Sequence, residues 1–222
     1  MFDPYSRKGR ILAAALAFAE KQSWAEVTLL GIAESADLPI GALREEFSSK
    51  SEIITGLLAA IDAEVLKRAG KGTEGQGKLD RLFDVIMTRF DVLGPHKAAL
   101  KSIHASGAAD LTLALPYLSS QHWMLEAAGI GTDGTSGALR VAGLGLAYAR
   151  VFRTWLEDDD PGLAKTMAAL DRRLRRGERT LGSLEHVIAT LSRFGAALGE
   201  LARSKTGGRP KSTAPGPDAG QI

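Results

Sequence analysis

The chain has 222 residues, of which 45% are hydrophobic and 24% are charged, and a formal net charge of +2, as expected for a globular protein of one large or two small domains. Cysteine is absent, which excludes disulfides, thiolate metal sites and cysteine nucleophiles, and the four histidines are too scattered to predict a metal site. The sequence shows no signal-peptide core and no apolar run near the roughly 18–20 residues of a membrane span, so we expect a cytoplasmic protein.

Apolar residues recur at helical spacing along the whole chain, and no stretch alternates with the period of a strand. We therefore predict an all-α protein of about nine helices. Glycine-rich breaks fall at residues 70–77 and 129–134. The predicted organisation is a head at residues 1–58, a connecting helix at 50–69, a helical body at 78–202, and a disordered tail at 203–222.

The N-terminal quarter contains three short helical patterns. The first spans about residues 5–22, the second is capped by Thr28 and ends near residue 35, and the third runs from Pro39 to Phe47. The spacing of Ile40, Leu43 and Phe47 predicts that they face the core of the head. The outer side of the third helix is then formed by Gly41, Ala42, Arg44, Glu45 and Ser48.

Two short helices joined by a tight turn and braced by a preceding helix form a helix-turn-helix, whose second helix enters the major groove of DNA. A capping box, Ser49 with Glu52, opens the connecting helix that follows.

Residues 8–58 resemble the head of the TetR family of bacterial regulators. The residues that carry the resemblance are Ile11-Leu12, Ala14–Leu16, Phe18-Ala19, Val27-Thr28, Ile32-Ala33, Ala36, Leu38, Gly41–Leu43, Phe47 and Ser49-Lys50. The resemblance implies a TetR-like fold, with a three-helix head and a larger helical body that binds a ligand and dimerises. It also implies phosphate contacts and base contacts, for which the candidate residues are Thr28, Pro39, Ile40, Gly41, Ala42, Arg44 and Lys50.

The charge of the head opposes DNA binding. Residues 1–60 contain six basic and eight acidic residues, and six minus eight is −2. Arg44 stands where the family typically has an aromatic residue, and Glu45 and Glu46 follow it. Neutralisation of phosphates dominates affinity for DNA, although Arg44 can pair with guanine and Glu45 can accept from cytosine. The sequence leaves open whether the head binds DNA or keeps only the fold.

Three stretches of the body, residues 79–93, 109–128 and 138–156, are rich in bulky apolar side chains. Such groups can enclose a cavity for an apolar ligand, and plain core packing would use the same residues. The candidate pocket residues are Phe83, Met87, Phe90, Trp123, Tyr148 and Phe152.

Two motifs in the body could suggest chemistry but do not support it. Gly143 and Gly145 lack the third glycine and the preceding strand of a nucleotide-binding loop, so they favour close helix packing. Ser119, Ser120 and His122 lack a nucleophile elbow and an orienting acid. We therefore predict no catalytic residue, metal or cofactor, and expect a protein that is not an enzyme.

Residues 79–176 carry a second resemblance. The segments 81–87 and 89–91, and the segment from Trp155 through Thr166 to residue 174, are similar to the lipid-binding accessory proteins of ubiquinone (coenzyme Q) biosynthesis. That family shares the TetR fold without being regulators. It implies an isoprenoid-lipid pocket, dimerisation, and a C-terminal amphipathic helix that touches membranes.

Residues 182–201 have such an amphipathic pattern, with an apolar stripe formed by Leu184, Val187, Ile188, Leu191, Phe194 and Leu198. A helix of this kind either pairs with its twin in a dimer or lies in a lipid interface.

Two functions therefore remain open. The first is a homodimeric TetR-type transcriptional regulator, in which a small apolar ligand moves the helix at residues 50–69 and changes the spacing of the two DNA-binding heads. The alternative is an isoprenoid-lipid-binding accessory protein of ubiquinone biosynthesis, peripheral at the inner membrane, that does not bind DNA.

Overall fold

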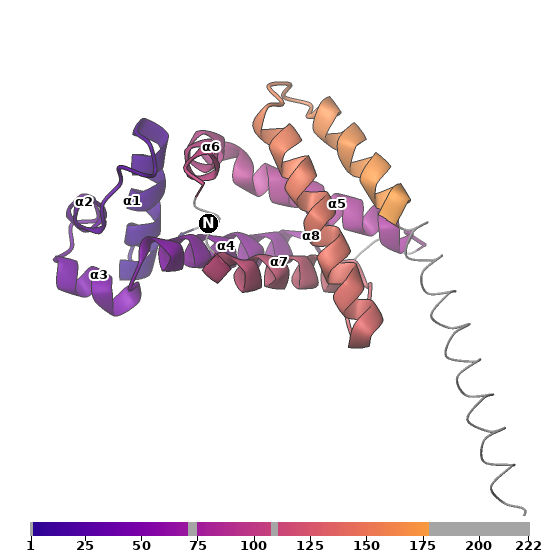
Figure 1. The fold of residues 1–222 in the computed structure, drawn as a ribbon, viewed down its shortest axis with the longest axis horizontal. Coiled ribbons are helices and arrows are strands. Elements are labelled where there is room, and N and C mark those ends of the chain that lie inside the picture. The colour runs from indigo at the N-terminus through magenta and orange to yellow at the C-terminus, as the bar shows by residue number, and fades with distance from the viewer. Residues whose placement is uncertain (1, 71–74, 108–110, 178–222) are drawn as a thin grey trace, which may run out of the picture. The chain divides into compact units, whose positions relative to one another are not determined.

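The computed structural model describes residues 2–70, 75–107 and 111–177 (Figure 1). The helices are α1 (Arg7–Lys21), α2 (Leu29–Ser35), α3 (Ile40–Glu46), α4 (Lys50–Arg68), α5 (Lys78–Leu93), α6 (Lys97–Ala105), α7 (Ala114–Ala127) and α8 (Gly134–Leu156). Short 3-10 turns precede α6 and α7, and residues 164–177 are helical as well. Within these ranges no strand occurs, so the prediction of an all-α fold is confirmed.

The predicted terminal helix at residues 182–201 and the tail at residues 203–222 lie outside the described residues. None of the described helices combines the length and the apolar character that crossing a bilayer requires.

Local capping fixes the start of α2 and the turn into α3. The hydroxyl of Thr28 accepts a hydrogen bond from the N–H of Gly31 at 3.1 Å, which confirms Thr28 as the N-cap. After α2 the chain turns through Asp37, whose φ of 53° lies in the left-handed region that Asp tolerates. Pro39 then precedes α3 and has no N–H that would need a partner. The two helices therefore start and stop where the sequence predicts, within one residue.

The predicted capping box at the start of α4 is present in part. The Ser49 hydroxyl accepts from the N–H of Glu52 at 3.1 Å. The Glu52 carboxylate accepts from the N–H of Ser48 rather than from that of Ser49. One acid of the head is thus used to satisfy the start of a helix.

The apolar side chains form two clusters, and α4 contributes to both. Its first half places Ile53 and Leu57 in the head cluster, which α1, α2 and α3 complete. Its second half places Ile61 and Val65 in the body cluster with α5, α7 and α8. Because burying one such side chain is worth about 1.5–3 kcal/mol, α4 is firmly bound to both parts.

The head and the body are also connected by α6 and α1, which pack against each other (Figure 1). Ala99 of α6 is fully buried in the head cluster. The hydroxyl of Ser102 accepts from the N–H of Trp24 and donates to the carbonyl of Gln22, both at 3.0 Å. The head and the body belong to one compact unit.

One inward-facing residue of the predicted head core was assigned wrongly. Leu43 and Phe47 are buried, with 1% and 4% of their surface exposed, but Ile40 is 47% exposed. Ile40 is the first residue of α3, and side chains of a helix tilt toward its N-terminus, so this one extends past the end of the helix. Phe47 follows the last residue of α3, so helical spacing does not relate it to Ile40.

Candidate DNA-binding site

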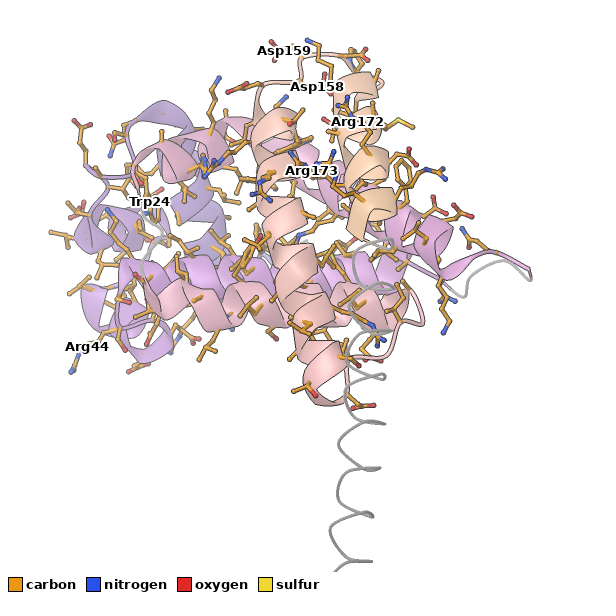
Figure 2. The ribbon with its side chains drawn as sticks, turned by 45° about the vertical axis from the view of Figure 1, so that its right-hand side comes forward. Trp24, Arg44, Asp158, Asp159, Arg172 and Arg173 are labelled. Atoms are coloured by element: carbon orange, nitrogen blue, oxygen red, sulfur yellow. The ribbon has the colours of Figure 1, made fainter. Side chains whose placement is uncertain are left out.

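The outer face of α3 is open surface. Pro39, Ile40, Gly41 and Arg44 are all exposed. At Gly41, apart from the adjacent residues and the backbone of α3 itself, no atom lies within 4 Å of the position that a Cβ would take. Figure 2 shows the Arg44 side chain extending into solvent, away from the rest of the head. This face can therefore contact a partner without rearrangement of the head.

The inner face of α3 is fixed to the head core. Leu43 is buried at the centre of the helix, and Phe47 is buried directly after its end. A Cβ at Gly56 of α4 would lie 2.7 Å from the Phe47 ring, so a glycine is needed for the ring to lie against α4. α3 is held as a rigid element, which recognition of a defined surface requires.

The acidic charge expected at this site is partly compensated. Arg7 of α1 forms a salt bridge with Glu45 of α3 at 2.7 Å, and both side chains are more than half exposed. An exposed pair of this kind adds little stability. Its consequence is electrostatic, because the negative charge beside Arg44 is balanced by a residue 38 positions earlier in the chain.

Lys50, a predicted phosphate contact, is engaged by the loop between α1 and α2. Its ammonium donates to the carbonyls of Trp24, Ala25 and Val27, and lies 4.9 Å from the centroid of the Trp24 ring. Burial lowers the pKa of this ammonium. Lys50 thus braces the loop that leads into α2, and a phosphate contact would have to draw its charge away from these carbonyls. Thr28 is exposed, with its hydroxyl engaged as the cap of α2.

Comparisons with known proteins agree with this architecture. The HTH-type transcriptional repressor KstR of Rhodococcus jostii (strain RHA1) is 36% identical over 76 residues, which are 34% of this chain and 35% of that protein. The match thus spans about a third of the length of that relative. No family model matches the sequence.

Three crystal structures of TetR regulators superpose on most of the chain. One from Nitrosomonas europaea ATCC 19718 has a TM-score of 0.62 at 22% identity, covering 78% of this chain and 98% of that one. One from Rhodococcus sp. RHA1 has a TM-score of 0.60 at 19% identity, covering 77% and 94%. One from Streptomyces coelicolor has a TM-score of 0.56 at 16% identity, covering 90% and 97%.

The chain has the TetR fold. The resemblance recognised in the head and the predicted fold class are thereby confirmed. The second resemblance, to accessory proteins of ubiquinone biosynthesis, gains no support from these relatives.

Within this TetR fold, the predicted pocket residues do not all lie together. The rings of Phe90 and Tyr148 stack at 5.6 Å, and those of Tyr148 and Phe152 at 6.0 Å. Phe83 and Met87 are half-buried against the same core. Trp123 lies apart, with 48% of its surface exposed. The amino-acid pattern could not show this, because residues 109–128 are apolar on almost every side.

The body core also contains a polar cluster that the sequence analysis missed. Arg89 of α5 is paired with Asp62 of α4, and its Nε donates to the Tyr148 hydroxyl at 3.1 Å. The hydroxyl of Ser120 on α7 donates to the same carboxylate at 2.6 Å. Arg89 lies in the apolar stripe of α5, seven residues after Leu82. A charged residue in that stripe was the signal in the sequence that could have revealed the cluster. The cluster ties α4 to three helices of the body.

Two further sequence-based interpretations can be compared with the structure. A Cβ at Gly145 would lie 3.3 Å from the Tyr117 ring, as expected for a glycine that lets α8 approach α7 closely. Gly143 faces open space instead. Among the described residues, no group of three or more His, Asp or Glu side chains is placed to hold a metal ion.

Proposed function

We propose that this chain is a TetR-type transcriptional regulator that binds DNA through α3. The observation that carries the proposal is the exposed outer face of α3, which is held on a buried inner face by Leu43 and Phe47. The printed names of the relatives support it, because one is a helix-turn-helix transcriptional repressor and the others are transcriptional regulators.

Three exposed residues of α3 can make contacts that suit the major groove. The Arg44 guanidinium can donate two hydrogen bonds to the O6 and N7 of guanine. Ile40 offers an apolar contact for a thymine methyl group. Gly41 has no side chain, so the backbone of α3 can approach the DNA closely at this position. The salt bridge between Arg7 and Glu45 reduces the repulsion that the sequence composition predicts.

We propose further that the regulator is a homodimer, because paired heads bind half-sites one helical turn apart, about 34–36 Å. Large apolar side chains remain exposed on α7 and α8, as expected of a surface that a second copy covers. They are Leu115, Trp123, Leu139 and Leu146. This assignment gives exposed Trp123 a role outside the ligand pocket.

In the proposed mechanism, a small apolar ligand in the body shifts α4 and so changes the spacing of the heads. The support is that α4 belongs to both apolar clusters and is tied to α5 and α7 through Asp62. The alternative of a quinone-pathway accessory protein is not favoured, because no observation on the described residues points to a lipid or a membrane.

The test is fluorescence anisotropy with a labelled duplex from the promoter region of its own gene, at about 50 mM salt, where electrostatic attraction is strong. The wild type should bind saturably, and Arg44→Ala should weaken binding by roughly 5- to 150-fold, as expected for one bidentate base contact. Arg68→Ala is the matched control, since it removes the same charge at the far end of α4 and should leave affinity within about twofold.

Two results would contradict the proposal. One is the absence of saturable binding by folded wild-type protein at low salt. The other is a loss of affinity that is as large in Arg68→Ala as in Arg44→Ala, which would show a general charge effect in place of recognition by α3.

A further inference from the structure

A basic groove lies on the body between α8 and the helical segment 164–177, which run side by side in both figures. Its volume is about 630 Å³. Three of the residues that line it are alanines, whose short side chains leave space between the basic ones. The lining residues are Thr154, Ala164, Lys165, Ala168, Ala169, Arg172, Arg173 and Arg176.

Two arginines of this groove, Arg172 and Arg173, lie close to each other and to Arg150 of α8. Burial lowers the pKa of the Arg173 guanidinium, and repulsion from Arg150, Arg176 and Arg172 lowers it further. Among the described residues, no salt bridge is recorded for Arg150, Arg172 or Arg173. Arg175 on the same segment behaves differently, because it pairs with Asp171 at 2.8 Å.

Like charges held close together destabilise a fold unless an anion neutralises them. A guanidinium offers a planar fork of donors that fits the oxygens of phosphate. A carboxylate would bring a single negative charge to several arginines, whereas a phosphate monoester brings about 1.5–2. The charge of the groove therefore favours phosphate, and its alanines leave room for the rest of a ligand.

We propose that this groove binds a small molecule that carries a phosphate or diphosphate group. The site is separate from the DNA-binding face, because Arg172 and Arg173 lie well away from Arg44 (Figure 2). It also differs in chemistry from the apolar pocket of the proposed function. The proposal goes beyond that function and is tested without DNA, so failure of one leaves the other standing.

The test is isothermal titration calorimetry, in which inorganic pyrophosphate is titrated into the full-length protein at about 50 mM salt. The wild type should bind saturably. The double variant Arg172→Gln/Arg173→Gln should bind at least about tenfold more weakly, because two charge-assisted contacts are lost. Arg175→Gln is the matched control, since it removes the same charge from the same segment, and it should bind within about twofold of the wild type.

Circular dichroism should confirm that the variants are folded. If the double variant does not fold, the single variant Arg173→Gln serves in its place and should also weaken pyrophosphate binding. The proposal is overturned if the wild type shows no saturable binding, or if the substitutions in the groove leave the affinity unchanged. An equal loss in Arg175→Gln would also overturn it, because it would indicate general charge attraction.

Two competition arms distinguish a small phosphate ligand from other polyanions. Vesicles with phosphatidylglycerol should not sediment the protein through this groove any better than vesicles of phosphatidylcholine alone. Random-sequence duplex DNA should not displace pyrophosphate. If vesicles sediment the protein through Arg172 and Arg173, and pyrophosphate does not prevent it, the groove binds a membrane. If DNA displaces pyrophosphate, the groove binds nucleic acid. Either result contradicts the proposal.

Discussion

Replacement of Asp62 by alanine should destabilise the protein strongly, because it leaves the guanidinium of Arg89 in the core without its anion. The side chain of Arg89 is 3% exposed and that of Asp62 is 16% exposed. Removing one partner of a buried ion pair typically costs about 3–5 kcal/mol. Some water reaches Asp62, so we expect about 2–4 kcal/mol here.

Urea unfolding followed by circular dichroism measures this free energy. With a slope of about 2 kcal/mol per M, the expected loss lowers the midpoint by about 1–2 M. The protein concentration must be held constant, since a dimer would make stability depend on it. Glu64→Ala is the matched control on the same helix, because Glu64 pairs with Arg68 at the surface, and it should shift the midpoint far less.

The double variant Asp62→Leu/Arg89→Met separates the cost of an unpaired charge from the value of the pair. Apolar residues of similar volume can replace a buried ion pair with little loss. We therefore expect the double variant to be more stable than Asp62→Ala. A midpoint for Asp62→Ala within about 0.3 M of the wild type would refute the reasoning, because it would mean that Arg89 finds solvent or another partner.

Three further predictions concern single residues. Glu45→Gln should raise affinity for random duplex DNA at low salt, measured by anisotropy, and an unchanged affinity would place that residue away from the phosphates. Gly56→Ala should lower the free energy of unfolding, measured in urea, by about 0.5–2 kcal/mol, because the methyl group of the alanine would meet the Phe47 ring. An increase in stability would show that the ring can move. Hydrogen bonds from Thr166 hold the pKa of Asp158 below its ordinary value of 3.8. The ionised carboxylate therefore adds to the free energy of unfolding above about pH 4, and this stabilisation is lost as the pH falls through the lowered pKa. Urea midpoints between pH 7 and pH 3 should therefore fall less steeply in Asp158→Asn than in the wild type, and parallel curves would contradict this.

The parts of the fold that depend on local chemistry were predictable from the sequence. Thr28 and Ser49 each cap a helix through a hydrogen bond to a residue three positions later, so their role is contained in a short segment. The burial of Leu43 follows from helical spacing in the same way. Ile40 shows the limit of this reasoning, because the end of a short helix is not covered by the core that spacing predicts.

Features that join distant segments were not predictable. Glu45 is balanced by Arg7, and Asp62 by Arg89, through pairs separated by 38 and 27 positions. The basic groove likewise depends on which face of segment 164–177 lies against α8. The exposure of Trp123 depends on where the neighbours of α7 lie, and a helix that is apolar all round does not reveal this. In each case the missing information is the packing partner.

Selection of bound sequences from a random pool of DNA duplexes tests the central claim, that α3 recognises DNA, most directly. The wild-type protein should enrich a site with two-fold symmetry and a guanine contact in each half. Arg44→Ala should lose the preference for that guanine while retaining weak binding to DNA in general. Failure of folded wild-type protein to enrich any sequence, or an identical preference in Arg44→Ala, would contradict the account.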